Sequence, residues 1–406
     1  MLPVNKISDT ISRPIYERKV MPFINKDLIK VFIGQRRVGK SYLIFQIIQL
    51  IENSFENPNI IYINKENVDF DFIRGYQELI DYATTNFSST RKNFIFIDEI
   101  QDIYSFEKAL RHLQSQGQWD IYCTGSNAKM LSGELATFLS GRYIEIKVYS
   151  LSYREFLHFH QLQNTPDSFI QYAKFGGLPY LKNLSLQDRI VFDYLKNIYQ
   201  AILFKDIVSR FDIRNAALLE QLSLYVADNI GNIVSAKKIN QFLKSQHIQV
   251  STNIILNYLQ YLVNAFFILK VKRHDLKGKK ILEVGEKYYM EDMGIRHALR
   301  NYRQNDIGQV FENLVFNHLK IWEYEVTIGK LYDKEIDFVC EKDGNTFYIQ
   351  VCLSLADEKT RAREYGNLEA IHDNYRKIVV TGDEYVIENI RGIETWNIRK
   401  FLHEFE

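Results

Sequence analysis

Residues 31–43, VFIGQRRVGKSYL, contain a glycine-rich turn of a type that binds phosphate groups. Gly34, Gly39, Lys40 and Ser41 fit the pattern G-x-x-x-x-G-K-[ST], and the turn lies between an apolar strand pattern and an apolar helix pattern. Backbone N–H groups of such a turn surround a phosphate, and the positive N-terminus of the next helix adds to the attraction. We expect Lys40 to reach the β- and γ-phosphates of a nucleotide and the Ser41 hydroxyl to bind Mg²⁺.

An apolar run over residues 93–102, NFIFIDEIQD, ends in two carboxylates. The run predicts a buried parallel strand, which places Asp98 and Glu99 at its carboxyl end, beside the glycine-rich turn. Asp98 is then expected to hold Mg²⁺, and Glu99 to orient or deprotonate an attacking water. The alternative is that the two acids only cap the next helix.

A second polar site follows the short strand pattern DIYCT, residues 120–124. Asn127 or Ser126 at this strand end could sense the γ-phosphate, and an ordinary strand-to-helix turn is the alternative. Together with the glycine-rich turn, this predicts a nucleotide site built from Gly34, Gln35, Arg36, Arg37, Val38, Gly39, Lys40, Ser41, Tyr42 and Asn127.

Strand patterns at 31–33, 59–64, 93–98 and 120–124 alternate with helical stretches. This alternation predicts an α/β fold with a parallel sheet.

The motifs GQRRVGKS, FIFIDEIQD, YCTGSNAKML, LSGRY and LSYREFL resemble those of the AAA+-type P-loop ATPases of the AAA_14 group, which usually carry a DUF4143 region behind the ATPase. The resemblance implies an ATPase that uses ATP and Mg²⁺ and changes conformation with nucleotide state. It also implies that Arg142, in SGRYIEI, is an arginine finger or sensor. Such an arginine acts within its own chain or, in a homo-oligomer, on a neighbouring subunit; the alternative is an ion pair with Glu145.

Residues 234–280 predict two helices followed by a β-hairpin, which is the plan of a winged helix-turn-helix. The second helix would expose Asn253, Asn257 and Gln260. Cations gather on the hairpin, at Lys270, Lys272, Arg273, Lys277, Lys279 and Lys280. These cations favour contacts with the phosphates of double-stranded DNA, but the polar, uncharged helix leaves a protein partner equally open.

The last hundred residues predict a helix with Glu312, a hairpin turning at Asp343 and Gly344, and a further helix and strand. The pattern D-x₁₂-Q-x-C, from Asp337 to Cys352, resembles the PD-(D/E)XK nuclease core that the DUF4143 region is thought to share. Cys352 stands where an active nuclease has lysine, so we expect a module without nuclease activity. An active nuclease and an unrelated α/β domain are the alternatives.

The chain of 406 residues is long enough for several domains. We expect an ATPase core at 1–160, a helical lid-like segment at 161–215, a winged helix at 216–290 and the nuclease-like module at 300–406. With 51 basic and 50 acidic residues the chain is not of the strongly basic, histone-like class. Neither a signal-peptide pattern nor a membrane-spanning run is evident, and three cysteines without metal-ligand spacing fit a reducing cytoplasm.

The function that these observations favour is an ATP-hydrolysing switch that couples nucleotide state to DNA or partner binding, with Glu99, Lys40 and Arg142 as the catalytic residues. One alternative is a switch set by nucleotide occupancy with little turnover. An ATP-powered nuclease is the other.

Overall fold

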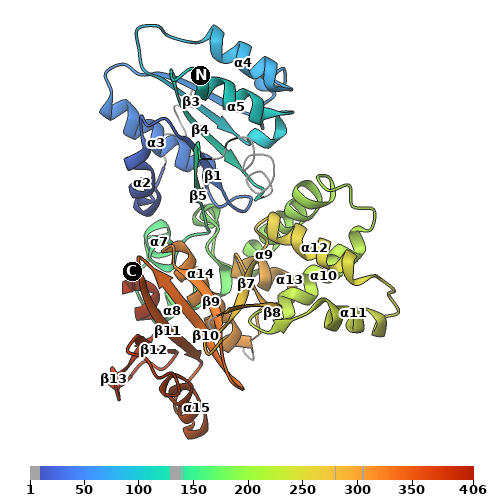
Figure 1. Ribbon diagram of the computed structural model, residues 1–406, viewed down its shortest axis with the longest axis vertical. Helices are drawn as coiled ribbons and strands as arrows, with labels where there is room; N and C mark the ends of the chain where they lie inside the picture. Colours follow the sequence, from blue (N-terminus) through green and yellow to red (C-terminus); the bar gives the residue numbers. More distant parts are fainter. Residues whose placement is uncertain (1–9, 129–138, 140, 279, 304–305) are drawn as a thin grey trace. The chain divides into compact units, whose positions relative to one another are not determined.

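The computed structural model describes residues 10–128, 139, 141–278, 280–303 and 306–406, with only the backbone described at 280–284. It contains two compact units (Figure 1), one formed by residues up to 149 with 264–266, and the other by 150–263 with 267–406. Over the described residues, no helix is both long and apolar enough to cross a lipid bilayer.

The first unit is built on a parallel sheet, as the alternation of elements predicted. Its strands are β1 (Ile29–Ile33), β2 (Asn59–Asn64), β3 (Asn93–Asp98), β4 (Trp119–Gly125) and β5 (Tyr143–Lys147). They lie in the order β2-β3-β4-β1-β5, and every neighbouring pair is parallel. All five carboxyl ends therefore share one edge, which is where ligands bind in sheets of this kind.

Helices cover both faces of this sheet (Figure 1). They are α2 (Pro14–Val20), α3 (Lys40–Ser54), α4 (Tyr76–Thr85) and α5 (Phe106–Ser115), with single 3₁₀ turns at η1 (Met21–Phe23), η2 (Val68–Phe70) and η3 (Ile100–Asp102). Alternate strand residues, among them Val31 and Ile95, share a core with Leu79 of α4 and Leu110 of α5. The opposite face carries α3, after which Phe55 packs against Phe94 with ring centroids 5.1 Å apart.

The second unit combines helices with a long mixed sheet. Its helices are α7 (Tyr153–His160), α8 (Pro166–Phe175), η5 (Pro179–Asn183), α9 (Asp188–Ala201), the π-helical η6 (Ile202–Val208), α10 (Ala216–Asp228), α11 (Ala236–Ser245), α12 (Thr252–Asn264), α13 (Met293–Arg300), α14 (Ile307–Ile321), α15 (Glu358–Glu369) and α16 (Ile398–Glu404). Its strands are β6 (Ile233–Val234), β7 (Ile268–Asp275), β8 (Lys280–Met290), β9 (Glu325–Leu331), β10 (Lys334–Lys342), β11 (Asn345–Cys352), β12 (Arg376–Thr381), β13 (Asn389–Ile390) and β14 (Ile393–Asn397). Within the described residues they form one sheet in the order β13-β14-β12-β11-β10-β9-β7-β8-β6.

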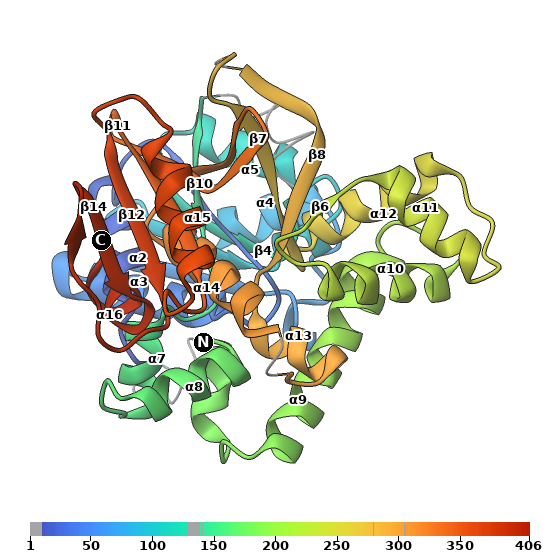
Figure 2. The ribbon, with the colours of Figure 1, turned by 90° about the horizontal axis from the view of Figure 1, so that it is seen from below.

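Helices α10, α11 and α12 lie together beside β6 (Figure 2). Ser235 caps α11, because its side chain accepts a hydrogen bond from the N–H of Lys238. Strand β8 pairs antiparallel with both β6 and β7. The exposed face of α12 includes the predicted Asn253, Asn257 and Gln260. Ile254 on the same helix is 41% exposed.

The last part of the second unit runs α14, β9, β10, β11, α15, β12. The predicted hairpin is present, and its turn residues Asp343 and Gly344 have φ of 51° and 76°, as a tight two-residue turn requires. Helix α14 covers one sheet face, where Phe316 stacks on Tyr289 at 4.4 Å between ring centroids. Helix α15 covers the other, where Leu368 joins the core that includes Val379 and other sheet residues.

Candidate nucleotide-binding site

The glycine-rich turn begins where β1 ends and closes where α3 begins, at Lys40. A side chain on Gly34 would meet the carbonyl oxygen of Val148, which lies 2.0 Å from the position of an ideal Cβ. Gly39 adopts a φ of 97°, which side-chain-bearing residues rarely adopt. Both glycines of the motif are therefore required by the local backbone, independently of any ligand.

Lys40 is folded back onto the turn. Its Nζ donates hydrogen bonds to the carbonyl oxygens of Gly34 and Gln35, both at 2.9 Å, and the residue is only 4% exposed. The carboxamide of Gln35 is fully buried, and both its nitrogen and its oxygen lack a hydrogen-bond partner among the described residues. A buried amide without partners is costly, so this turn offers polar groups that a bound phosphate or water could satisfy.

The two carboxylates lie at the end of β3, where the sequence placed them. Asp98 is 2% exposed and accepts hydrogen bonds from the hydroxyls of Thr124, Tyr62 and Ser41, the Tyr62 bond being 3.2 Å long. Burial raises the pKa of the Asp98 carboxyl, and the hydrogen bonds from Thr124 and Ser41 oppose that rise. The Ser41–Asp98 contact joins the start of α3 to the end of β3 and brings together two oxygen ligands of the kind that Mg²⁺ prefers.

Glu99 follows Asp98 in a left-handed conformation, with a φ of 56°. Its N–H donates to the Thr124 hydroxyl at 2.9 Å, and its carboxylate accepts a hydrogen bond from the side-chain amide of Gln101. A positive φ is uncommon outside glycine and has to be held by its surroundings. Thr124 on β4 and Gln101 therefore fix the direction of the Glu99 side chain.

Strand β4 lies between β1 and β3, so its carboxyl end falls between the glycine-rich turn and the two acids. Ser126 and Asn127 follow this strand and are 1% and 2% exposed. Tyr42, in the first turn of α3, is 48% exposed. The sheet order thus gathers the predicted turn, Asp98, Glu99 and Asn127 at one edge.

Arg142 lies at the opposite edge of the sheet. β5 runs parallel to β1, with Tyr143 opposite Ile29 and Lys147 opposite Ile33, so Arg142 precedes the strand whose far end is beside the turn. One strand length of about 13 Å separates the two edges. Of the two alternatives left open for Arg142, this position favours action on a neighbouring subunit over action on the nucleotide of its own chain, because the exposed side chain begins at the edge away from the turn.

Arg13 supports the turn, and sequence reasoning missed it. Its guanidinium is buried and donates to the carbonyl oxygens of Val38 and Tyr149, each at 3.0 Å, while stacking over the Tyr16 ring. An arginine next to a helix has no motif of its own, so no pattern in the sequence identified it. It positions the turn through the backbone of Val38.

The two arginines inside the turn have different environments. Arg37 is exposed. Arg36 is buried, and its Nη1 lies 3.0 Å from the Oε1 atom of Glu66, which follows β2. Glu66 was not among the predicted site residues.

Comparison with known proteins assigns the first part of the chain. Residues 26–157 match the AAA_14 family, described as an AAA domain. Residues 166–306 match DUF8612, a domain of unknown function, in part of the region for which the resemblance implied DUF4143.

Two relatives span nearly the whole chain. An uncharacterized protein of Haemophilus influenzae is 37% identical over 395 residues, which are 95% of this chain and 96% of that protein. The uncharacterized protein MJ1544 of Methanocaldococcus jannaschii is 31% identical over 420 aligned positions, which are 95% of this chain and 91% of that protein. Among solved structures, the Walker-type ATPase Paby2304 of Pyrococcus abyssi superimposes with a TM-score of 0.50 at 16% identity, covering 72% of this chain and 97% of that one. That likeness concerns the fold alone.

Proposed function

This chain belongs to the family of its bacterial and archaeal relatives and carries an AAA-type ATPase domain, and on that premise we propose that it binds ATP and hydrolyses it. The observation that carries the proposal is the arrangement at the sheet edge, where the Lys40 ammonium, the Ser41–Asp98 contact and Glu99 follow neighbouring elements. These are the parts that phosphoryl transfer to water needs.

In the proposed reaction, Glu99 orients a water molecule and accepts its proton. The water oxygen forms a bond to the γ-phosphorus, and the bond from that phosphorus to the β–γ bridging oxygen breaks, releasing phosphate and ADP. Lys40 exchanges its two backbone carbonyls for the β- and γ-phosphate oxygens. Ser41 and Asp98 would hold Mg²⁺, which when bound neutralises charge on those phosphates.

We propose that Arg142 acts on the nucleotide of a neighbouring subunit in a homo-oligomer. The nucleotide site of its own chain lies at the other edge of the sheet. Mixing tests this. A Lys40→Ala subunit keeps Arg142, and an Arg142→Ala subunit keeps an intact turn. We expect each variant alone to be nearly inactive and the mixture to recover phosphate release, because one partner supplies the arginine that the other lacks. Full activity of Arg142→Ala alone would contradict the proposal.

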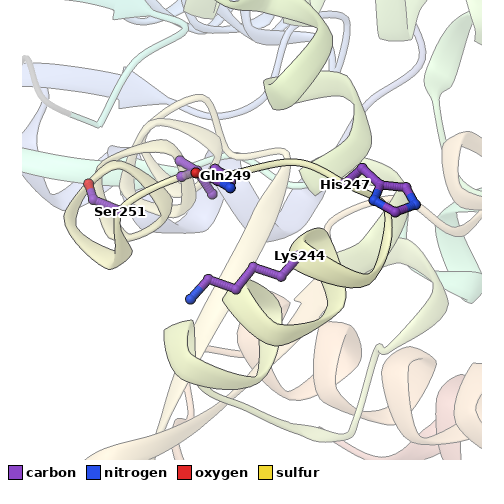
Figure 3. A pocket seen from close by; sticks show the side chains of 5 residues that line it. Lys244, His247, Gln249 and Ser251 are labelled. Atoms are coloured by element: carbon purple, nitrogen blue, oxygen red, sulfur yellow. The ribbon is translucent and has the colours of Figure 1, made fainter.

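The second part of the proposed function is binding of double-stranded DNA by a winged helix. The order α10, β6, α11, α12, β7, β8, with β8 paired to both β6 and β7, supports this. A hollow at the turn between α11 and α12 is lined by Lys244, His247 and Ser251 (Figure 3), beside the N-terminus of α12. The Lys244 ammonium and a helix N-terminus suit the phosphate backbone.

The predicted basic hairpin supports this part less strongly. Lys270 pairs with Glu286, and Lys277 lies over the Tyr332 ring at 4.7 Å. Lys279 lies outside the described residues. Exposed Ile254 and Leu256 on α12 are the features that favour a protein partner instead.

Phosphate release from ATP and Mg²⁺ by the full chain, with and without duplex DNA, tests both parts. We expect turnover that rises when DNA is added, because a domain that binds DNA in one nucleotide state is linked to the nucleotide site. Turnover indifferent to DNA would contradict the DNA part and leave a protein partner. ATP binding without turnover would contradict hydrolysis and leave a switch set by occupancy.

For the last part of the chain we propose a nuclease-like fold without nuclease activity. The order α14, β9, β10, β11, α15, β12 supports the fold. Gln350, in the slot of the second acid, has both ends of its amide engaged: Oε1 accepts from the N–H of Asp337 and Nε2 donates to Glu364, both at 2.7 Å. It is therefore not directed at a metal. Cys352 replaces the lysine that activates water, and a thiol supplies no positive charge.

A further inference from the structure

Arg36 lies where a cation would meet the γ-phosphate. The Lys40 ammonium, which reaches the β- and γ-phosphates in turns of this type, bonds to the carbonyls of Gly34 and Gln35, the two residues just before Arg36. The γ end of a bound nucleotide therefore lies near the start of the turn. Arg36 is the next residue, and its side chain is only 9% exposed.

Glu66 holds that guanidinium toward the acidic strand end. β2 pairs with β3 so that Asn64 is opposite Asp98, and the N–H of Lys65 donates to the Asp98 carbonyl at 3.2 Å. Glu66 is the following residue, with its own N–H bonded to the Asn64 side chain at 2.9 Å. The Arg36–Glu66 pair thus reaches from the turn to the element beside Asp98, across the edge where the γ-phosphate and attacking water belong.

We propose that Arg36 is the γ-phosphate sensor of its own chain and that Glu66 is its alternative partner when no γ-phosphate is present. This inference rests on the proposed nucleotide site. A γ-phosphate offers the guanidinium more negative charge and a bidentate geometry, so it displaces the Glu66 carboxylate, whereas ADP leaves the pair intact. Glu66, with 43% of its side chain exposed, moves into water at little cost.

The release of Glu66 links nucleotide state to the loop that follows β2. Residues 65–73 of that loop are held by the Lys65 ammonium, which donates to the carbonyls of Phe70 and Ile73. Loss of the Arg36 contact removes one ion pair that joins this loop to the turn. The pair therefore distinguishes ATP from ADP in two ways, through affinity and through the position of the loop.

Equilibrium binding of fluorescent ATPγS and ADP measures the proposal without turnover. Arg36→Ala is expected to lower ATPγS affinity by about 10-fold or more, the loss of a charge-assisted contact, and to leave ADP affinity within about twofold. Glu66→Gln removes the competitor and is expected to raise ATPγS affinity by about fivefold with ADP again unchanged. Arg36→Lys is expected to recover only part of the ATPγS affinity that Arg36→Ala loses, because an ammonium lacks the bidentate geometry of a guanidinium.

A double variant and two controls make the test decisive. In the Arg36→Ala background, Glu66→Gln should no longer affect ATPγS binding. Asp71→Asn and Arg74→Ala change exposed charges in or beside the same loop and should alter neither affinity. Equal effects on ATPγS and ADP, or an unchanged Glu66→Gln effect without Arg36, would overturn the inference. A wild type that binds ATPγS but releases no phosphate would contradict hydrolysis alone, and one that binds no nucleotide would overturn both.

Discussion

Lys40→Ala should reduce ATP turnover by at least about 100-fold and weaken ATP binding by about 10- to 100-fold. The ammonium is the one that reaches the β- and γ-phosphates in turns of this type, and it is buried with two backbone carbonyls as its partners in the turn. Alanine removes both the charge that meets the phosphates and the bonds that hold the turn closed. Phosphate release measures the loss of turnover, and binding of a fluorescent ATP analogue measures the loss of affinity.

Glu99→Gln separates binding from chemistry at the same site. Glutamine keeps the size of the side chain but accepts no proton, so turnover should fall by about 100-fold or more while ATP affinity stays within about threefold. A loss of affinity as large as the loss of turnover would contradict the role of Glu99 as the residue that orients and deprotonates water.

Lys108→Ala is the control for Lys40→Ala. Lys108 is an exposed lysine on α5 in the same unit, and its ammonium lies 5.1 Å from the centre of the Tyr76 ring. This variant should keep most of the wild-type turnover. If Lys108→Ala were as inactive as Lys40→Ala, the loss would reflect a general loosening of the unit rather than a phosphate contact.

The nucleotide site was largely predictable because its parts carry local signals. The turn has a fixed spacing, and Asp98 and Glu99 end an apolar run whose burial the structure reproduces at every residue. The parallel sheet follows from the alternation of strands and helices, and a parallel sheet brings strand ends to one edge. The alternation alone predicts that they share an edge, whereas the strand order that makes β1, β4 and β3 neighbours comes from the structure.

What the sequence left open or missed depended on pairing between distant segments. Arg142 was placed by resemblance, and only the register of β5 on β1 shows which edge it occupies. Glu66 has no motif of its own, and only the pairing of β2 with β3 shows that it lies near Asp98. Lys287 lies within the winged helix predicted at 216–290, but β7 pairs with β9 and so joins β7 and β8 to the last part of the sheet. Lys287 of β8 thereby contacts Glu312 of α14 and Glu335 of β10.

Substitution of Lys287 is expected to have the largest effect on stability. Its Nζ lies 3.0 Å from Glu312 Oε1 and 2.8 Å from Glu335 Oε1, and its side chain is 3% exposed. The ammonium is desolvated, but the carboxylates of Glu312, Asp337 and Glu335 outweigh that effect and raise the pKa of Lys287. Tyr289 adds a hydrogen bond to Glu312 at 2.6 Å.

Lys287→Met should lower the free energy of unfolding by about 3 kcal/mol or more, because methionine fills the space but leaves the partly buried carboxylates of Glu312 and Glu335 without a counter-charge. Adding Glu312→Gln removes one of those carboxylates, so the double variant should be more stable than the sum of the single changes by about 1–3 kcal/mol. Lys400→Met, at a half-exposed lysine 3.7 Å from Glu388, is the control and should change stability by less than about 0.5 kcal/mol. Urea unfolding measures all of them.

The pH dependence of the stability of Lys287→Met shows whether the lysine acts through its charge. Burial and the neighbouring Glu312 already raise the pKa of Asp337 well above its ordinary value in the folded chain. A carboxyl with a raised folded pKa binds more protons when folded, so its penalty is absent below the unfolded pKa, grows as the pH rises from the unfolded to the folded pKa, and is complete above the folded pKa. Without the ammonium that shift increases, so the variant should regain stability relative to wild type as the pH falls from the folded pKa of Asp337 toward the ordinary aspartate pKa of about 4. A difference that stays constant over this range would mean that Lys287 stabilises the sheet by packing its methylene groups rather than by its charge.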